Sequence, residues 1–118
     1  MKNYRLFITF NSNPIHYGEQ LTATAKTKFD NVAYLLKTAN QNGFPYHISE
    51  INYESISNVK LWVNEEDIEI VYGEINRNNL EEKLERIKEI LKDIKGKKGK
   101  IDISSENYIE RTVFTERY

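Results

Sequence analysis

The chain has 118 residues, no cysteine, and 17 basic against 18 acidic side chains, for a formal net charge of -1. This length suits a single domain over residues 1–118. The absence of cysteine excludes disulfides, thiolate metal sites and a cysteine nucleophile, and the balanced charge argues against wholesale nucleic-acid binding. No apolar run approaches the ~20 residues that span a bilayer, so we expect the chain as given to be soluble.

The N-terminal third predicts a strand, a loop and a helix. Aromatic and β-branched residues at 4–10 favour a strand, and the Asn, Ser, Pro and Gly that follow favour an irregular loop. A helix is predicted from about Thr24 to Gln41, because apolar residues recur there at helical spacing and Gly43 suits a helix C-terminus. The apolar stripe of this helix consists of Phe29, Val32, Leu35, Leu36 and Ala39.

Three strands are predicted in the middle of the chain, at 46–54, 58–63 and 67–73. In each of them apolar and polar residues alternate, which is typical of a strand with one buried face. The connections between them are short and polar, so we expect an antiparallel meander.

A strongly amphipathic helix is predicted after this meander. Asn79 followed by Glu82 resembles a capping box at its start, and Glu82 and Arg86 form a favourable pair one turn apart. Nearly all residues of the outer face are charged, whereas the inner face is apolar. The inner stripe consists of Leu80, Leu84, Ile87, Leu91 and Ile94, with Ile90 beside it.

The stretch KGKKGKIDIS, residues 95–104, follows this helix and has two interpretations. Its glycines, lysines and serine do not follow the order found in a phosphate-binding loop. It also follows the C-terminal end of a helix, where the negative end of the helix dipole disfavours an anion. The favoured interpretation is a joint, in which lysines complement the negative helix end and Gly96 or Gly99 supplies a left-handed exit. The alternative is a weak contact with an anionic surface.

Two strands are predicted at the C-terminal end, at 99–104 and 107–114, with a tight turn at Ser105 and Glu106 between them. The predicted order is therefore β-α-β-β-β-α-β-β. This order indicates the α+β class, with a mixed, largely antiparallel sheet of about six strands and two helices packed on one face.

No catalytic residue, metal ligand or cofactor site is predicted. His16 and His47 are far apart in the sequence, and there is no cysteine to complete a zinc site. The acidic stretch at 64–67 is typical of a solvated turn, and the serines at 55, 57, 104 and 105 lack the surroundings of a hydrolase nucleophile. We therefore do not expect an enzyme.

The last predicted strand is the candidate interaction site. A terminal hairpin strand is often an edge strand, whose unpaired N–H and C=O groups can bind a partner strand. The alternative is that this strand is internal, or that its edge is blocked by the charges of Glu110 and Arg111. The candidate partner-binding residues are Asn107, Tyr108, Ile109, Glu110, Arg111, Thr112, Val113 and Phe114.

Several of these segments together resemble the C-terminal β domain of the bacterial cell-division protein FtsQ, called DivIB in Gram-positive bacteria. The similarity lies in ISEINYE and in VYGEINRNNLEEKLERIKEILKDIKGKKGKIDIS, which present a strand ending in Gly73, an amphipathic helix, a lysine- and glycine-rich joint and the strand start KIDIS. The upstream segments PIHYGEQL and FDNVAYLLKTANQNGF resemble the start of the same domain.

The resemblance implies a non-enzymatic scaffold of the division septum, on the outer face of the cytoplasmic membrane. In that family a cytoplasmic tail, a transmembrane helix and a POTRA domain precede this region, so the chain would be an extracytoplasmic fragment of a membrane-anchored protein. The implied partners are small division proteins of the FtsB/DivIC and FtsL type, which would add a strand at 107–114. The alternative is a small cytosolic α/β module that binds a ligand or acts as an inhibitor.

Overall fold

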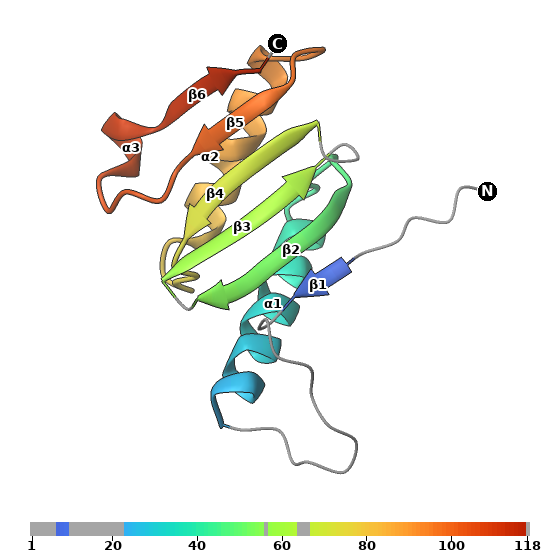
Figure 1. Cartoon of the computed structure of the whole chain (residues 1–118), viewed down its shortest axis with the longest axis vertical. Coiled ribbons are helices and arrows are strands. Elements are labelled where there is room, and N and C mark those ends of the chain that lie inside the picture. Colours follow the sequence, from blue (N-terminus) through green and yellow to red (C-terminus); the bar gives the residue numbers. More distant parts are fainter. Residues whose placement is uncertain (1–6, 10–22, 56, 64–66, 118) are drawn as a thin grey trace, which may run out of the picture.

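Figure 1 shows the computed structural model, which describes residues 7–9, 23–55, 57–63 and 67–117. In this part of the chain six strands form one sheet, and three helices lie between them in sequence. In chain order the elements are β1 (Phe7–Thr9), α1 (Ala23–Gln41), β2 (Ile48–Ser55), β3 (Asn58–Val63), β4 (Ile68–Gly73), α2 (Leu80–Asp93), β5 (Gly99–Asp102), α3 (Tyr108–Arg111) and β6 (Val113–Glu116).

The strands lie side by side in the order in which they occur in the chain, from β1 at one edge to β6 at the other. The pairs β2–β3, β3–β4 and β5–β6 are antiparallel, whereas β1–β2 and β4–β5 are parallel. The predicted α+β class with a mixed, largely antiparallel sheet is therefore confirmed, and so is the antiparallel meander of β2, β3 and β4.

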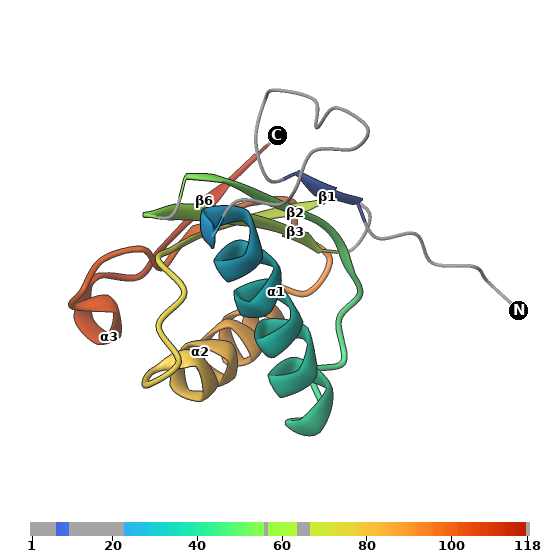
Figure 2. The same cartoon turned by 90° about the horizontal axis from the view of Figure 1, so that it is seen from below.

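Both long helices cover the same face of the sheet, as the sequence predicted (Figure 2). Each is the crossover between two parallel neighbours, α1 between β1 and β2 and α2 between β4 and β5. β1 and β4 run in the same direction, because two antiparallel pairings separate β4 from β2. Both crossovers lead to the next strand in the same direction across the sheet, from β1 toward β6. Two connections of the same handedness that do so place their helices on the same face.

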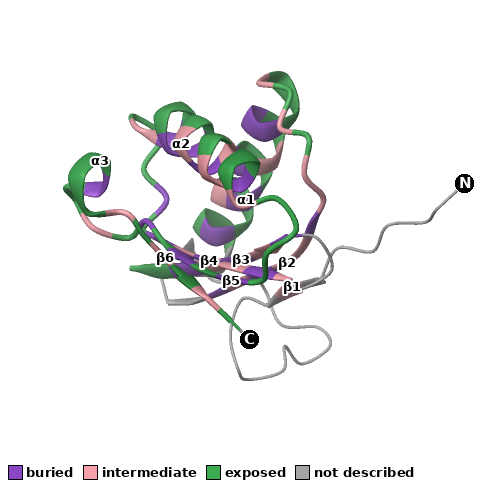
Figure 3. Ribbon diagram, turned by 90° about the horizontal axis from the view of Figure 1, so that it is seen from above, coloured by how far each residue is buried: buried purple, intermediate pink, exposed green. Residues whose placement is uncertain are grey.

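A row of apolar side chains crosses the sheet on the face that the helices cover. Its central members lie opposite one another in register and are at most 1% exposed: Ile51, Leu61, Ile70 and Ile101. Ile8 and Phe114 continue the row onto the two edge strands and are partly buried. α2 contributes Leu80, Leu84, Ile87 and Leu91 to the core. Figure 3 colours the ribbon by burial and shows buried stretches on both the long helices and the sheet.

The predicted stripe of α1 is right in its second half and wrong at Phe29. Val32, Leu35 and Ala39 are buried, but the Phe29 side chain is 45% exposed. The neighbouring Lys28 is buried instead, and its ammonium lies 5.8 Å from the centre of the Tyr53 ring. Among the helix residues whose burial is described, Lys28 is the first that is buried, as a lysine can be when its aliphatic stem lies along the protein surface.

The predicted capping box at the start of α2 is absent. The Asn79 side chain makes no capping hydrogen bond, and the main-chain hydrogen bonds of the helix begin with Lys83 N donating to Asn79 O. Arg86 pairs with Glu89 rather than with Glu82, through Nη1 and Oε2 at 3.7 Å.

The stretch at 95–104 is the joint between α2 and β5 that the favoured interpretation predicts. Gly96 has a φ of 85°, a left-handed conformation that glycine adopts without strain. Lys97 N donates to Ile94 O and closes a turn directly after α2, and Gly99 N donates to Asp67 O at the start of β5.

The predicted strand at 107–114 is wrong over most of its length. Tyr108–Arg111 form the short helix α3, and the strand β6 begins at Val113 and extends to Glu116. Asn107 O accepts from the N–H groups of Glu110 and Arg111, and Asn107 Nδ2 donates to Glu110 Oε2. These contacts close a helical turn over residues 107–111, where the first half of the strand was predicted.

Candidate protein-interaction edge

β6 is the outer strand of the sheet on the side of the C-terminus (Figure 1). Among the described strands it pairs with β5 alone. Of the residues predicted to bind a partner, Val113 and Phe114 lie on this edge. The others lie on α3 or at its ends, with Asn107 before the helix and Thr112 after it.

The hydrogen-bond pattern of β5–β6 determines which main-chain groups face outward. Arg117 N donates to Lys98 O across the ladder at 2.7 Å. Because hydrogen-bonded and non-hydrogen-bonded pairs alternate in an antiparallel ladder, Val113 and Thr115 direct their N–H and C=O groups toward β5. Phe114 and Glu116 therefore direct theirs away from the sheet, where a partner strand would bind. Glu116 lies outside the residues predicted from the sequence.

The side chains of β6 alternate between the two faces of the sheet. Phe114 lies opposite Ile101 and packs partly on the core under the helices. Val113 lies opposite Asp102 on the other face and is 56% exposed. A strand added to β6 would therefore place alternate side chains beside the aromatic ring of Phe114 and beside the exposed Val113.

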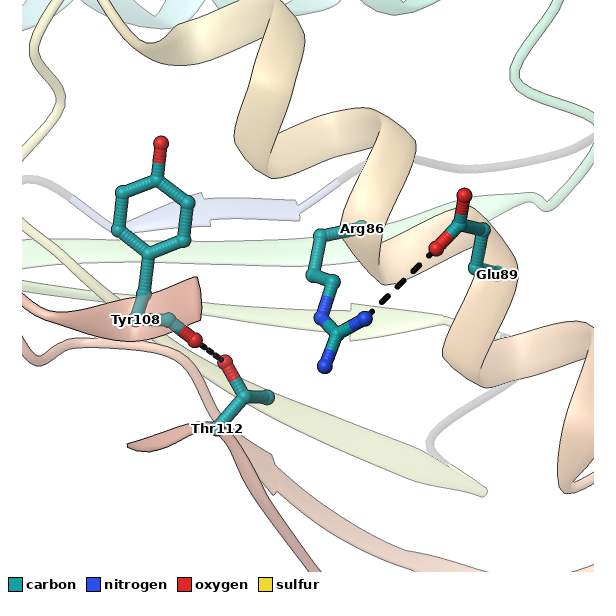
Figure 4. A network of polar contacts seen from close by, with 4 residues as sticks. All are labelled: Arg86, Glu89, Tyr108 and Thr112. Carbon is teal, nitrogen blue, oxygen red and sulfur yellow. Dashed lines mark hydrogen bonds and ion pairs between the residues drawn. The ribbon is translucent and has the colours of Figure 1, made fainter. Parts of the chain in front are cut away.

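The Tyr108 side chain on α3 lies against α2, near Glu82 and Lys83. The residue is 6% exposed, and burial together with the neighbouring Glu82 carboxylate raises its pKa above the usual tyrosine range. The Thr112 hydroxyl donates to Tyr108 O, a contact drawn in Figure 4. This contact ties the start of β6 to the helix before it.

A groove of about 240 Å³ lies between the outer face of α2 and α3. Figure 4 shows the Arg86 side chain between α2 and the segment that carries Tyr108 and Thr112. The exposed Ile109 contributes the apolar part of the groove. The residues that line it are Glu82, Glu85, Arg86, Glu89, Tyr108 and Ile109.

Of the other sequence candidates, Ser57, Ser104 and Ser105 line one polar hollow of about 290 Å³ beside the start of α2, and the described histidine, His47, is not part of it. His47 precedes β2, whereas His16 and residues 64–66 lie outside the described part of the chain. Within that part, no group of three or more His, Cys, Asp or Glu side chains could hold a metal ion. The helices that the structure describes include none long and apolar enough to cross a membrane.

Comparison with protein-family models and with curated proteins found no match for this chain. The resemblance to the FtsQ/DivIB β domain therefore stays a prediction from the sequence.

Proposed function

We propose that this chain is a non-enzymatic protein-interaction domain that binds a partner segment as an additional strand on β6. The observation that carries the proposal is the position of Phe114 and Glu116, whose main-chain groups face outward on the outer strand of the sheet. Main-chain pairing supplies affinity in this mode of binding, and alternate side chains supply specificity.

The partner that the sequence favours is a small division protein of the FtsB/DivIC type, with FtsL as a further component. Under this proposal the domain acts at the division septum, on the outer face of the cytoplasmic membrane, as part of a membrane-anchored protein. The resemblance of 48–104 to the FtsQ/DivIB β domain supports this choice of partner, and the edge position of β6 supports the mode of binding.

Proline at position 116 tests the mode of binding. Proline lacks the N–H donor and fixes φ, so it blocks one edge of a ladder. The Glu116 N–H faces outward, so Glu116→Pro leaves the hydrogen bonds between β5 and β6 in place. The matched control is Glu116→Ala, which removes the same carboxylate and its 4.0 Å ion pair with Lys97 but keeps the donor.

The measurement is fluorescence anisotropy with a labelled extracytoplasmic fragment of the FtsB/DivIC-type protein encoded in the same genome. We expect Glu116→Pro to abolish binding and Glu116→Ala to bind like the wild type, with circular dichroism spectra unchanged in both. Wild-type affinity in a folded Glu116→Pro variant would exclude β6 as the docking edge. A wild-type domain that does not bind this fragment would contradict the choice of partner.

A further inference from the structure

The edge strand β6 runs alongside α2, and contacts at both ends of the strand fix this arrangement. At its start, α3 leads into β6, and Tyr108 on α3 lies against Glu82 on α2. At its end, Glu116 on β6 pairs with Lys97, just past the end of α2, through Oε1 and Nζ at 4.0 Å. The groove between α2 and α3 is therefore continuous with the edge at which a partner strand would be added (Figure 4).

This groove has an excess of negative charge. Three of its lining side chains are carboxylates, Glu82, Glu85 and Glu89, and all three residues are exposed. Among the described residues one cation lines it, Arg86, whose guanidinium lies 3.7 Å from Glu89. Glu85 also pairs with Lys88 at 2.9 Å. Ion pairs that are exposed to solvent are weak, so these carboxylates can still attract a cation from a partner.

A strand added to β6 would direct alternate side chains toward this charged face of α2. Phe114 lies opposite Ile101 on the face of the sheet that the helices cover. A side chain of the partner on the same face would lie beside Phe114, and the next one toward α3 would lie over the groove. The apolar part of the groove is Ile109, whose side chain is 61% exposed.

We propose that the partner segment on β6 is basic on the face that it turns toward α2, with lysine or arginine at alternate positions. This inference rests on the proposed function, because it describes the partner strand of that same edge. The charged end of such a residue lies among the carboxylates of the groove, and its aliphatic stem covers the exposed Ile109. An acidic strand meets like charges at the same positions, which disfavours its binding.

Two synthetic peptides of equal length test the charge requirement. In one, lysine alternates with threonine, and in the other glutamate replaces lysine. Threonine favours an extended strand in both. With fluorescence anisotropy of labelled, end-capped peptides we expect the lysine peptide to bind the wild-type chain at least about tenfold more tightly than the glutamate peptide. Equal affinity of the two peptides, or no binding of the lysine peptide, would overturn the proposal.

The double variant Glu85→Gln/Glu89→Gln tests the assignment to the groove. The matched control is Glu81→Gln/Asp93→Asn, which removes two exposed carboxylates of α2 that do not line the groove. We expect the affinity for the lysine peptide to fall about three- to tenfold in the groove variant and to stay at the wild-type value in the control. An equal loss in both variants would exclude the groove as the site of the charged contact.

Glu116→Pro, measured against Glu116→Ala, separates this inference from the proposed function. We expect Glu116→Pro to lose the lysine peptide, because the peptide pairs with β6. If it does so while the groove variant keeps wild-type affinity, the β6 edge stands and the charge requirement is overturned. If Glu116→Pro binds the lysine peptide like Glu116→Ala, the peptide does not pair with β6, and both the inference and the proposed mode of binding are overturned.

Discussion

The ammonium of Lys83 on α2 lies 5.4 Å from the centre of the Tyr108 ring on α3. The same ammonium lies 4.5 Å from the centre of the Tyr72 ring on β4. One buried cation thus lies near two aromatic rings, a kind of contact that desolvation strengthens. It joins α2, β4 and the helix α3 that precedes β6.

Replacing Tyr108 should weaken the attachment of α3 and β6. We expect Tyr108→Ala to lower the free energy of unfolding by ~2–5 kcal/mol, because a buried aromatic ring is lost. Amide hydrogen exchange at Thr115, whose N–H faces β5, should become faster in this variant. Ile109→Ala is the control, since Ile109 is 61% exposed and its loss should stay within about 0.5 kcal/mol. Equal effects of the two changes in urea unfolding would contradict the role of Tyr108.

The core stripe of α2 should dominate stability. Leu84 and Leu91 are buried against the sheet, so Leu84→Ala or Leu91→Ala should lower the free energy of unfolding by ~2–5 kcal/mol. The exposed Lys92 provides the control, and Lys92→Ala should change it by less than about 0.5 kcal/mol. Thermal or urea unfolding measures these values, and a loss below about 0.5 kcal/mol at both leucines would show that the stripe faces solvent.

Gly99 should be intolerant of a side chain because of a close approach within the sheet. A Cβ atom at this position would collide with Thr115 O and lie 2.9 Å from the Phe114 ring, both on β6. We expect Gly99→Ala to destabilise by ~1–3 kcal/mol and to weaken binding at the β6 edge. A Cβ at Gly96 would meet no atom within 4 Å, so Gly96→Ala measures the cost of its left-handed backbone alone, ~1–2 kcal/mol. Unchanged stability and unchanged partner affinity in Gly99→Ala would contradict the close approach.

Asp102 should contribute a stability that depends on pH. Ser104 donates to Asp102 Oδ1 from its hydroxyl at 2.6 Å and from its N–H at 3.0 Å, and the hydroxyl contact is the main cause that lowers the pKa of this carboxyl. Because that pKa is lower in the folded chain, the unfolded chain binds more protons on acidification. The contribution of Asp102 to the free energy of unfolding is therefore fully present above pH 3.8, the ordinary pKa of the carboxyl. It is lost as the pH falls from 3.8 through the lower pKa of the folded chain.

Ser104→Ala tests this dependence, since it removes the hydroxyl and keeps the N–H. The urea midpoint of the wild type should fall more steeply than that of Ser104→Ala as the pH is lowered through 3.8. The effect should be modest, because Asp102 is exposed and solvent screens its charge. Parallel pH profiles would show that the hydroxyl contact does not stabilise the folded chain.

The sequence predicted the long elements well and the C-terminal segment poorly. The predicted strand at 58–63 coincides with β3, and the helix from about Thr24 to Gln41 differs from α1 by one residue at its start. At 107–114 a hairpin strand was predicted, but Asn107 O accepts from Glu110 N and Arg111 N, and Asn107 Nδ2 donates to Glu110 Oε2, so residues 108–111 form a helix. The contact of Tyr108 with Lys83 joins residues from different elements, and no local pattern predicts that contact.

The sequence by itself determined the order of the long elements, their type and, apart from Phe29 on α1, the face that each buries. The type and the buried face follow from the spacing of the apolar residues, because a helical or an alternating spacing places them all on one face of a helix or of a strand. The tertiary structure alone decided where the edge strand begins, which of its main-chain groups face outward and which polar groups line the hollow beside the start of α2. Lys83 is the clearest case: it belongs to a charged stretch of the sequence, yet it is buried because Tyr72 and Tyr108 approach it from β4 and α3. These features depend on neighbours that folding brings together, and their positions are set by the packing of the whole domain.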